Sequence, residues 1–539
     1  MTPRSLVSLV LAVTIWAACS PAPSGPVTGG AAVVRGGAEL RPVPLPDVSK
    51  AVPSVQRQIQ ERHASLIRMV DDRSTSTLDL GNAFGETGKL LMAAQMYDAA
   101  EPCFLNAQTL NTGDYRWPYY LAQMYRAQGE LPKALANFER AIALQPDDVS
   151  TLVWLGELYL QQGRPEAAEP QFSRALVLQP GSVSARYGLG RTALARDDAR
   201  RAVTYLEETL QRDPKASSAH YPLSLAYAAV GNKEKADEHL RLRGSREILP
   251  SDPLMVDLES LLESPQTYET LGIRGLERED WPLAAEQFRK GLELAPDSAA
   301  LHHRLGAALS MMGDKAGARR QFEKAVQLSP DYFLAQYSLG VLDQGDGQHA
   351  RAVEHFAEAL RARPIYTEAR LRMASSLRRI GRTSGALSAY QQALANEADS
   401  TEARLGYAMT LVQVGRDRDA RDHLSAAVQT GGTDAIVFKS ALARLLAASP
   451  NDSVRDGTQA MRLVQELLEH GRTLELGETM AMALAAMGEY DRAAAVQRDL
   501  LKGARANNVT AVVPRLSANL AHYERGEPCR TPWTLDEMP

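Results

Sequence analysis

Alanine recurs along this chain at one fixed interval, the interval from Ala134 to Ala168, and this regularity constrains the fold more than any other feature. A first series holds four alanines, a second holds five, and one wider step separates the two series. The first is Ala134, Ala168, Ala202 and Ala236, the second is Ala284, Ala318, Ala352, Ala386 and Ala420, and Ala93 precedes the first series by a step slightly longer than the interval. A period of this kind marks a stack of identical units, and such stacks typically bind partners rather than catalyse reactions.

Other positions of the period predict that each unit is a pair of helices. A large apolar residue follows each alanine by four positions and another alanine often follows three later, so these residues share one helix face. A small residue precedes the alanine by twelve positions, as Gly156 precedes Ala168. Glycine or a charged residue separates the two helices, as at Gly163. Proline closes most units, as at Pro180, because it lacks an N–H and restricts the residue before it.

This pattern resembles the tetratricopeptide repeat, a helix pair of about 34 residues with Leu-Gly, Tyr, Ala, Phe, Ala and Pro positions. The resemblance covers roughly residues 74–434 as ten units, and a weaker pattern continues to about residue 500. It implies an all-α fold, a tetratricopeptide-repeat solenoid in which antiparallel helix pairs form a right-handed superhelix in two arrays. The 539-residue length agrees, because single cores stop growing near ~250–300 residues whereas a solenoid has no such limit.

Two seams and several non-repeat segments complete the expected organisation. A few extra residues follow Leu105 before Tyr115, and a larger insertion at Ile248–Ser264 is expected to form a loop and a short helix. The expected parts are a signal peptide (1–18), a flexible tether (19–52), an N-terminal capping helix (53–73), a first array (74–248), a linker (249–264), a second array (265–434), degenerate repeats with a C-terminal capping helix (435–525) and a tail (526–539).

The N-terminal residues predict export. A short positive stretch precedes apolar residues up to Ala18, which are fewer than the ~20 residues that span a bilayer. Ala17-Ala18-Cys19 resembles the lipobox of bacterial lipoproteins, which implies that Cys19 carries a lipid anchor. Ser20 then implies sorting to the outer membrane. Trp16 occupies a position where that family has an aliphatic residue, so cleavage by the ordinary signal peptidase is the alternative.

Motifs for catalysis, metals and cofactors are nearly absent. Residues 188–193 match the letters of a dinucleotide fingerprint, but they lie in a predicted first helix, where Gly190 takes the small-residue position. Cys-x-x-Cys, His-Glu-x-x-His and Gly-x-Ser-x-Gly do not occur in the sequence. His239, His355 and His423 share one repeat position and are expected on a solvated face rather than at a metal. We therefore expect no cofactor, no metal site and no enzyme.

The resemblance implies that first helices line a concave groove for a protein or peptide. The matching positions are Tyr119, Gln123, Arg126, Glu157, Tyr187, Arg191, Tyr221, His303, Tyr337, Arg378 and Arg379. Tyrosine offers flat amphipathic area at low entropic cost, although it can equally serve only the packing of the repeat. The 60 basic residues against 65 acidic ones, a net charge of −5, argue against nucleic acid as a partner.

Together these features predict an exported, non-catalytic scaffold that binds proteins or peptides, in cell-envelope or pilus assembly by resemblance. It is expected on the periplasmic side of the envelope as an outer-membrane lipoprotein, touching the membrane through its anchor only, with no small-molecule substrate. The alternative is an accessory subunit that positions substrate for an exported enzyme or secretion complex. A catalytic domain is not expected, since repeats and caps consume nearly the whole chain.

Overall fold

The computed structural model describes residues 33–35, 37–430 and 432–534, and these residues are predominantly helical. The chain divides into two compact units, Met1–Glu277 (unit 1) and Arg278–Pro539 (unit 2). The all-α repeat fold that the sequence predicts is confirmed. Cys19 and the predicted signal peptide lie outside the described residues. None of the helices among the described residues is both long and apolar enough to cross a bilayer.

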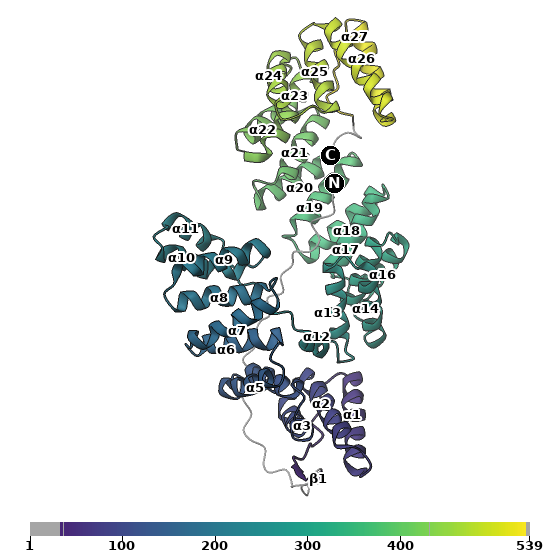
Figure 1. Ribbon diagram of the computed structural model, residues 1–539. Coiled ribbons are helices and arrows are strands. Elements are labelled where there is room, and N and C mark those ends of the chain that lie inside the picture. Colours follow the sequence, from purple (N-terminus) through teal and green to yellow (C-terminus); the bar gives the residue numbers. More distant parts are fainter. Residues whose placement is uncertain (1–32, 36, 431, 535–539) are drawn as a thin grey trace. The chain divides into compact units, whose positions relative to one another are not determined.

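Unit 1 begins with a short β-hairpin, and its helices from Pro53 to Arg241 then form a stack of antiparallel pairs in which each helix packs against the next (Figure 1). Its elements are β1 (Val33–Arg35), β2 (Ala38–Leu40), α1 (Pro53–Asp71), α2 (Thr77–Ala93), α3 (Tyr97–Leu110), α4 (Arg116–Ala127), α5 (Leu131–Leu144), α6 (Val149–Gln161), α7 (Pro165–Leu178), α8 (Val183–Ala195), α9 (Ala199–Arg212), η1 (Ser217–Ala219), α10 (His220–Ala229), α11 (Lys233–Arg241), α12 (Pro253–Glu259) and α13 (Pro265–Glu277).

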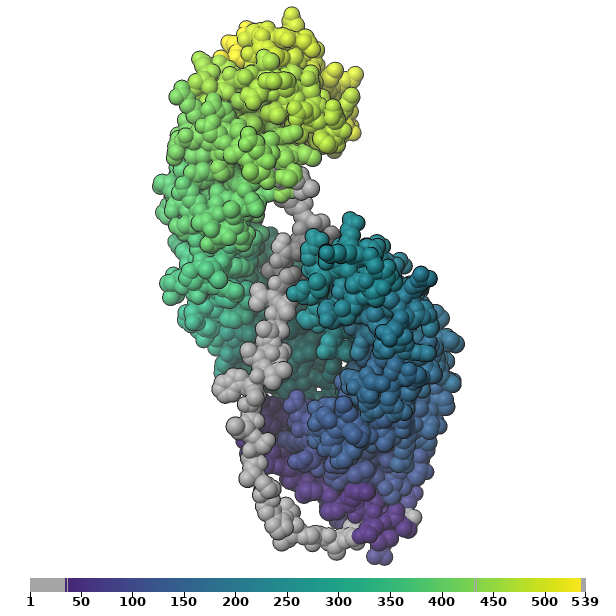
Figure 2. Space-filling view, turned by 90° about the vertical axis from the view of Figure 1, so that its left-hand side faces the viewer, coloured from purple at the N-terminus to yellow at the C-terminus, as the bar shows by residue number. Residues whose placement is uncertain are grey.

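Unit 2 is built from helix pairs of the same kind. Its surface follows the sequence from teal through green to yellow in the space-filling view (Figure 2). Its elements are α14 (Trp281–Leu294), α15 (Ala299–Met311), α16 (Lys315–Leu328), α17 (Phe333–Gly345), α18 (His349–Ala362), α19 (Thr367–Arg379), α20 (Thr383–Asn396), α21 (Thr401–Gln413), α22 (Asp417–Thr430), η2 (Gly432–Asp434), α23 (Ala435–Ala448), α24 (Gly457–Leu468), α25 (Leu474–Ala486), α26 (Tyr490–Ala506), η3 (Thr510–Val512) and α27 (Val513–Glu524).

The recurrent alanine lies near the start of the second helix in each pair, and its side chain is in the core. Ala168 on α7 is 0% exposed. The small residue of the first helix lies where that helix meets the aromatic ring of the second. A Cβ added at Gly156 would lie 2.7 Å from the ring of Phe172, and one at Gly340 would lie 2.6 Å from the ring of Phe356. The recurrent alanines and small residues are therefore required by the close packing of the two helices in each pair.

The first repeat has a different register from the predicted one. Ala93 is only half-buried, whereas Ala100 on α3 is 0% exposed and is followed by the buried ring of Phe104. Since Ala100 stands one full period before Ala134, the longer step predicted from Ala93 and the seam after Leu105 are wrong. The error arose because α2 carries glycines at positions 81 and 88, which lie on one helix face and fit the pattern equally well.

Left-handed residues end the first helices, as the glycine-or-charged pattern predicts. Gly129, Gly163 and Gly313 have φ angles of 78°, 68° and 85°. Asp197 takes the same place in its repeat with a φ of 59°. Aspartate tolerates this region better than most residues, whereas glycine adopts it without strain, so the turn is kept at both kinds of position.

The N-terminal end of the repeat stack is covered by non-repeat residues. There α1 buries Val55, Ile59 and Leu66 against the first repeat, and the expected capping helix 53–73 lies at this place. The preceding segment also packs on the array, because the Arg41 N–H donates to Asn106 Oδ1 and Asn106 Nδ2 donates to the Arg41 carbonyl, both at 2.8 Å. The part of the expected tether that follows β2 is therefore held against α3.

Candidate functional site

The first helices of unit 1 present a row of side chains at equivalent repeat positions. Glu157 on α6 and Arg191 on α8 stand one repeat period apart and form an ion pair between Oε2 and Nη1 at 2.6 Å. The Arg191 guanidinium also lies 5.3 Å from the centre of the Tyr187 ring. These predicted groove residues are brought together, and they join two successive repeats.

A second cluster joins α4 and α6. The Arg126 guanidinium lies 4.1 Å from the centre of the Trp154 ring, and Arg126 Nε donates to Gln123 Oε1 at 3.1 Å. Burial lowers the pKa of Arg126, and nearby oxygens, including the Asp252 carboxylate, oppose that shift. The sequence prediction named Arg126 and Gln123 but missed Trp154, which occupies the same repeat position as Tyr120. That shared position was the signal that could have found it.

Tyr119 and Gln123 contact a residue of their own chain. Both side chains are buried, at 0% and 2% exposure. The Tyr119 hydroxyl donates to the Asp252 carboxylate, and Gln123 Nε2 and Trp154 Nε1 approach the same Oδ2 atom at 3.4 Å and 3.0 Å. Burial, and then the charge of Asp252, raise the pKa of Tyr119. Tyr119 and Gln123, expected to face a partner, are therefore hydrogen-bonded to Asp252 of the same chain.

The segment expected as a linker, 249–264, lies across the first helices of unit 1. Ser150 Oγ donates to the Ser251 carbonyl at 2.8 Å, and the Tyr120 hydroxyl donates to the Leu254 carbonyl at 3.2 Å. The short helix α12 that the sequence predicts is present and packs beside α2. Leu258 on α12 is 6% exposed and joins the core of the first repeats.

Tyr221 is the most exposed aromatic side chain of the predicted set. It lies on α10 with 52% of its surface exposed, and Leu225, one helical turn later, is 46% exposed. Tyr221 shares the repeat position of Tyr119 and Tyr187, since whole numbers of repeat periods separate the three. The last repeat of unit 1 therefore presents an aromatic and an aliphatic side chain to solvent.

In unit 2, His303 and Tyr337 are packed between helices. His303 Nε2 lies 3.2 Å from Ser338 Oγ, and its ring centre lies 5.5 Å from that of Phe322. Burial lowers the pKa of His303 to about 4, so the ring is neutral near pH 7. Tyr337 is 5% exposed; its hydroxyl donates to Glu368 Oε1 at 3.2 Å, and burial raises its pKa.

Arg378 and Arg379 end α19 and differ in burial. Arg378 is 0% exposed and interacts with the Tyr390 side chain, and burial lowers the pKa of Arg378. Its backbone carbonyl accepts a hydrogen bond from Gln413 Nε2 at 3.3 Å. Arg379 is half-buried. The structure therefore places Arg378 inside the repeat stack and leaves Arg379 nearer the surface.

Sequence reasoning missed a polar ladder on the first helices of unit 2. Arg372 Nε donates to the Tyr337 hydroxyl at 2.9 Å, and Arg372 Nη1 donates to Gln344 Oε1 at 3.2 Å. Gln344 Nε2 in turn donates to Ser376 Oγ at 2.9 Å. Gln344 precedes Arg378 by one full period, so the repeat could have identified it. The ladder ties α17 to α19 through side chains.

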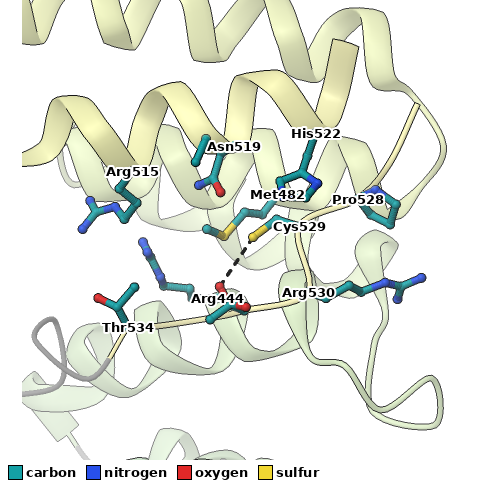
Figure 3. A pocket seen from close by; sticks show the side chains of 11 residues that line it. Arg444, Met482, Arg515, Asn519, His522, Pro528, Cys529, Arg530 and Thr534 are labelled. Atoms are coloured by element: carbon teal, nitrogen blue, oxygen red, sulfur yellow. Dashed lines mark hydrogen bonds between the residues drawn. The ribbon is translucent and has the colours of Figure 1, made fainter. Parts of the chain in front are cut away.

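A cavity of about 210 Å³ lies between α23, α27 and the C-terminal tail (Figure 3). Two of its arginines are held by a buried carboxylate, because Arg444 Nη1 and Arg515 Nη2 lie 3.1 Å and 2.9 Å from Glu478 Oε2. Arg444 Nε also donates to the Pro532 carbonyl at 2.5 Å, and Cys529 Sγ donates to the Thr531 carbonyl at 3.5 Å. These contacts fasten the tail to the last repeats.

The recurrent histidines contact polar partners on the neighbouring first helices. His239 Nδ1 lies 2.9 Å from His220 Nδ1, and His355 Nδ1 lies 2.8 Å from Gln336 Oε1. The position expected on a solvated face is thus partly buried in these repeats. Across the part of the chain that the structure describes, no group of three or more His, Cys, Asp or Glu side chains is placed to hold a metal ion.

Comparison with family models identifies the repeat in parts of both units. Models of the tetratricopeptide repeat match residues 86–149, 121–183, 154–199, 187–242, 299–332 and 377–445. No curated protein matches the chain. Similar solved structures include MamA (19% identity, 40% of this chain and 92% of that one, TM-score 0.22), the TPR domain of P58(IPK) (17%, 77%, 98%, 0.27) and YrrB, described as a TPR protein with an unusual peptide-binding site (18%, 44%, 96%, 0.22).

Proposed function

The chain belongs to the tetratricopeptide-repeat family, and from this premise we propose that it is a scaffold that binds proteins or peptides through the first helices of its repeats. Stacked helix pairs present extended surfaces and typically act as interaction platforms rather than catalysts. The function is therefore to hold partners, and its specificity lies in the side chains at equivalent positions of successive repeats.

One observation carries the proposal: a row of amphipathic side chains at equivalent positions of the last repeats of unit 1. Tyr221 is half exposed on α10, Tyr187 stands on α8 at the same repeat position, and the Glu157–Arg191 pair continues the row towards α6. Aromatic rings give large contact area for little lost entropy, and charged groups beside them set the register of a bound chain.

The proposed setting is the cell envelope. What supports it is the sequence alone: the apolar stretch before Cys19 and the small residues that precede this cysteine. A scaffold anchored there would collect partners in an exported assembly. Growth with a clickable fatty acid should label the wild-type protein but not Cys19→Ser, and absence of label on the wild type would contradict the anchor.

The groove is tested by replacing two of its tyrosines together. Tyr187→Ala with Tyr221→Ala should weaken partner binding by about tenfold or more, since truncated aromatic anchors at interfaces often cost ~2 kcal/mol. The measurement is partner capture after crosslinking in intact cells, followed by affinity with the purified partner. Helicity is measured alongside binding, because Tyr221 is half exposed whereas Tyr187 packs against the core of its repeat.

Tyr205→Ala is the matched control, because Tyr205 is a tyrosine on the second helix α9 of the same array. It should leave partner affinity unchanged. Equal affinity of the wild type and the double variant would contradict a groove on the first helices.

A further inference from the structure

Residues 244–263 run along the first helices of unit 1 in the reverse order of the repeats. The Gly244 N–H donates to the Ser217 carbonyl, just before α10, at 3.1 Å. The path then passes Ser150 on α6 and Tyr120 on α4, which bind the carbonyls of residues 251 and 254. It ends at α1, where Gln58 Nε2 donates to the Leu261 carbonyl at 2.8 Å. A single segment therefore crosses several repeats.

Asp252 is the polar centre of this contact. Its side chain is 8% exposed, and the donors that reach Oδ2 are the neutral groups of Tyr119, Gln123 and Trp154. The other oxygen, Oδ1, accepts from the Met255 N–H at 3.1 Å and caps α12. Burying a carboxylate is costly unless hydrogen-bond donors replace the water molecules that solvate it. Three donors that converge on one oxygen atom therefore form a binding site for a carboxylate.

Apolar contacts define the rest of the bound segment. Pro253 follows the acid and begins α12, while Leu254 and Met255 pack against the core of the first repeats. Leu258, one turn further on, is 6% exposed. By contrast, residues that precede Asp252 are exposed to solvent: Leu249 is 58% exposed and Ser251 is also exposed. Pro253 itself is exposed, so the recognised features are the aspartate and the apolar residues that follow the proline.

We propose that the first helices α4 and α6 form a recognition site for a peptide with an Asp-x-Leu core, and that residues 251–258 occupy this site in cis. The inference rests on the proposed function, and it adds the chemistry of one ligand and its regulation. A partner that carries the same core in an exposed segment binds unit 1 only when it displaces the chain's own residues.

The covalent link between residues 251–258 and unit 1 explains why this segment controls access to the site. A segment linked to its own site acts at an effective concentration in the millimolar range, and the apparent affinity of a competitor falls by the fraction of open sites. Releasing the cis segment should therefore raise the affinity for a free peptide without changing any residue of the receptor.

The test uses the full chain and a fluorescent peptide of residues 247–263. Asp252→Ala in the protein removes the buried acid of the cis segment and leaves Tyr119, Gln123 and Trp154 in place. The peptide should bind this variant at least ~10-fold more tightly than it binds the wild type, by fluorescence anisotropy. A peptide in which the residue equivalent to Asp252 is alanine should lose that binding.

Asp257→Ala is the matched control, because Asp257 is an exposed aspartate on the same helix α12. It should bind the peptide as weakly as the wild type does. Equal affinity of the peptide for the wild type, Asp252→Ala and Asp257→Ala, or equal binding of the alanine peptide, would overturn the inference.

Hydrogen exchange supplies a second readout that does not depend on the free peptide. The amides of α12 should exchange faster in Asp252→Ala and in Trp154→Phe, which removes one donor while keeping an aromatic ring for Arg126. Poor folding would itself speed the exchange of these amides. Unchanged exchange in both variants would therefore contradict cis occupancy. If peptide competition fails while the Tyr187 and Tyr221 substitutions still abolish partner capture, only this inference falls.

Discussion

Each repeat depends on a small residue of the first helix that meets a large side chain of the second. A Cβ at Gly306 would lie 2.6 Å from the Phe322 ring, and Ala318 in the same repeat is 0% exposed. Interiors are packed too densely to accept added methylenes without moving their neighbours. The alanine period is therefore a packing signal, and it carries no information about the partner.

Ala318→Leu should overpack this repeat and lower the stability of unit 2 by about 1–3 kcal/mol. The control is Ala316→Leu, since Ala316 lies on the same helix α16 and is exposed. Thermal unfolding followed by circular dichroism measures both variants. Equal melting temperatures for Ala318→Leu and the wild type would show that this position is not in the core.

His303 gives unit 2 a pH dependence whose sign is fixed by its lowered pKa. The folded protein holds the ring neutral down to about pH 4, whereas the unfolded chain protonates near the ordinary value of 6.5. Its contribution to stability is therefore full above pH 6.5 and is lost as pH falls from 6.5 towards 4. His303→Gln should show a shallower loss of stability than the wild type over that range in urea unfolding. Parallel profiles would contradict a neutral His303 ring in the folded protein.

At the scale of helices, the C-terminal elements are joined by one carboxylate. Glu478 on α25 is 0% exposed and binds Arg444 on α23 and Arg515 on α27. Asn519 Nδ2 also donates to Glu478 Oε1, at 2.9 Å. Three helices thus share one buried acid, and this acid fixes the register in which α27 covers the last pair.

Glu478→Ala should destabilise unit 2 by about 3–5 kcal/mol, because it removes the carboxylate shared by the buried Arg444 and the half-buried Arg515. Glu475→Ala is the control, since Glu475 is exposed on the same helix. Chemical unfolding should separate the two variants clearly. A loss of under about 1 kcal/mol for Glu478→Ala would mean that water, rather than Glu478, satisfies the arginines.

Periodicity predicted most of the elements but could not predict how non-repeating residues contact them. The alanine series located the second helices, and failed only at α3, where two glycines on one face of α2 allowed two registers. The contact between Tyr119 and Asp252 joins residues that are far apart in the chain and leaves no periodic trace. For the same reason the sequence named Tyr119 and Gln123 as partner-facing without indicating which segment faces them.

At the scale of the whole molecule, each unit is a scaffold with its own surface. In unit 1 the chain's own residues 251–258 cover part of the first helices, while Tyr187, Arg191 and Tyr221 continue the row beyond them. In unit 2 the corresponding helices are joined by the ladder of Arg372 and Gln344. The two arrays therefore share a fold and differ in the chemistry that they present.

The central claim is that partners bind the first helices, and site-specific photocrosslinking in intact cells tests it most directly. A photoreactive phenylalanine at Tyr221 on α10 should give a covalent adduct with another protein, whereas the same residue at Thr204, exposed on the second helix α9, should give none. Adducts from Thr204 but not from Tyr221, or none from Tyr221 while the protein remains folded, would contradict the account.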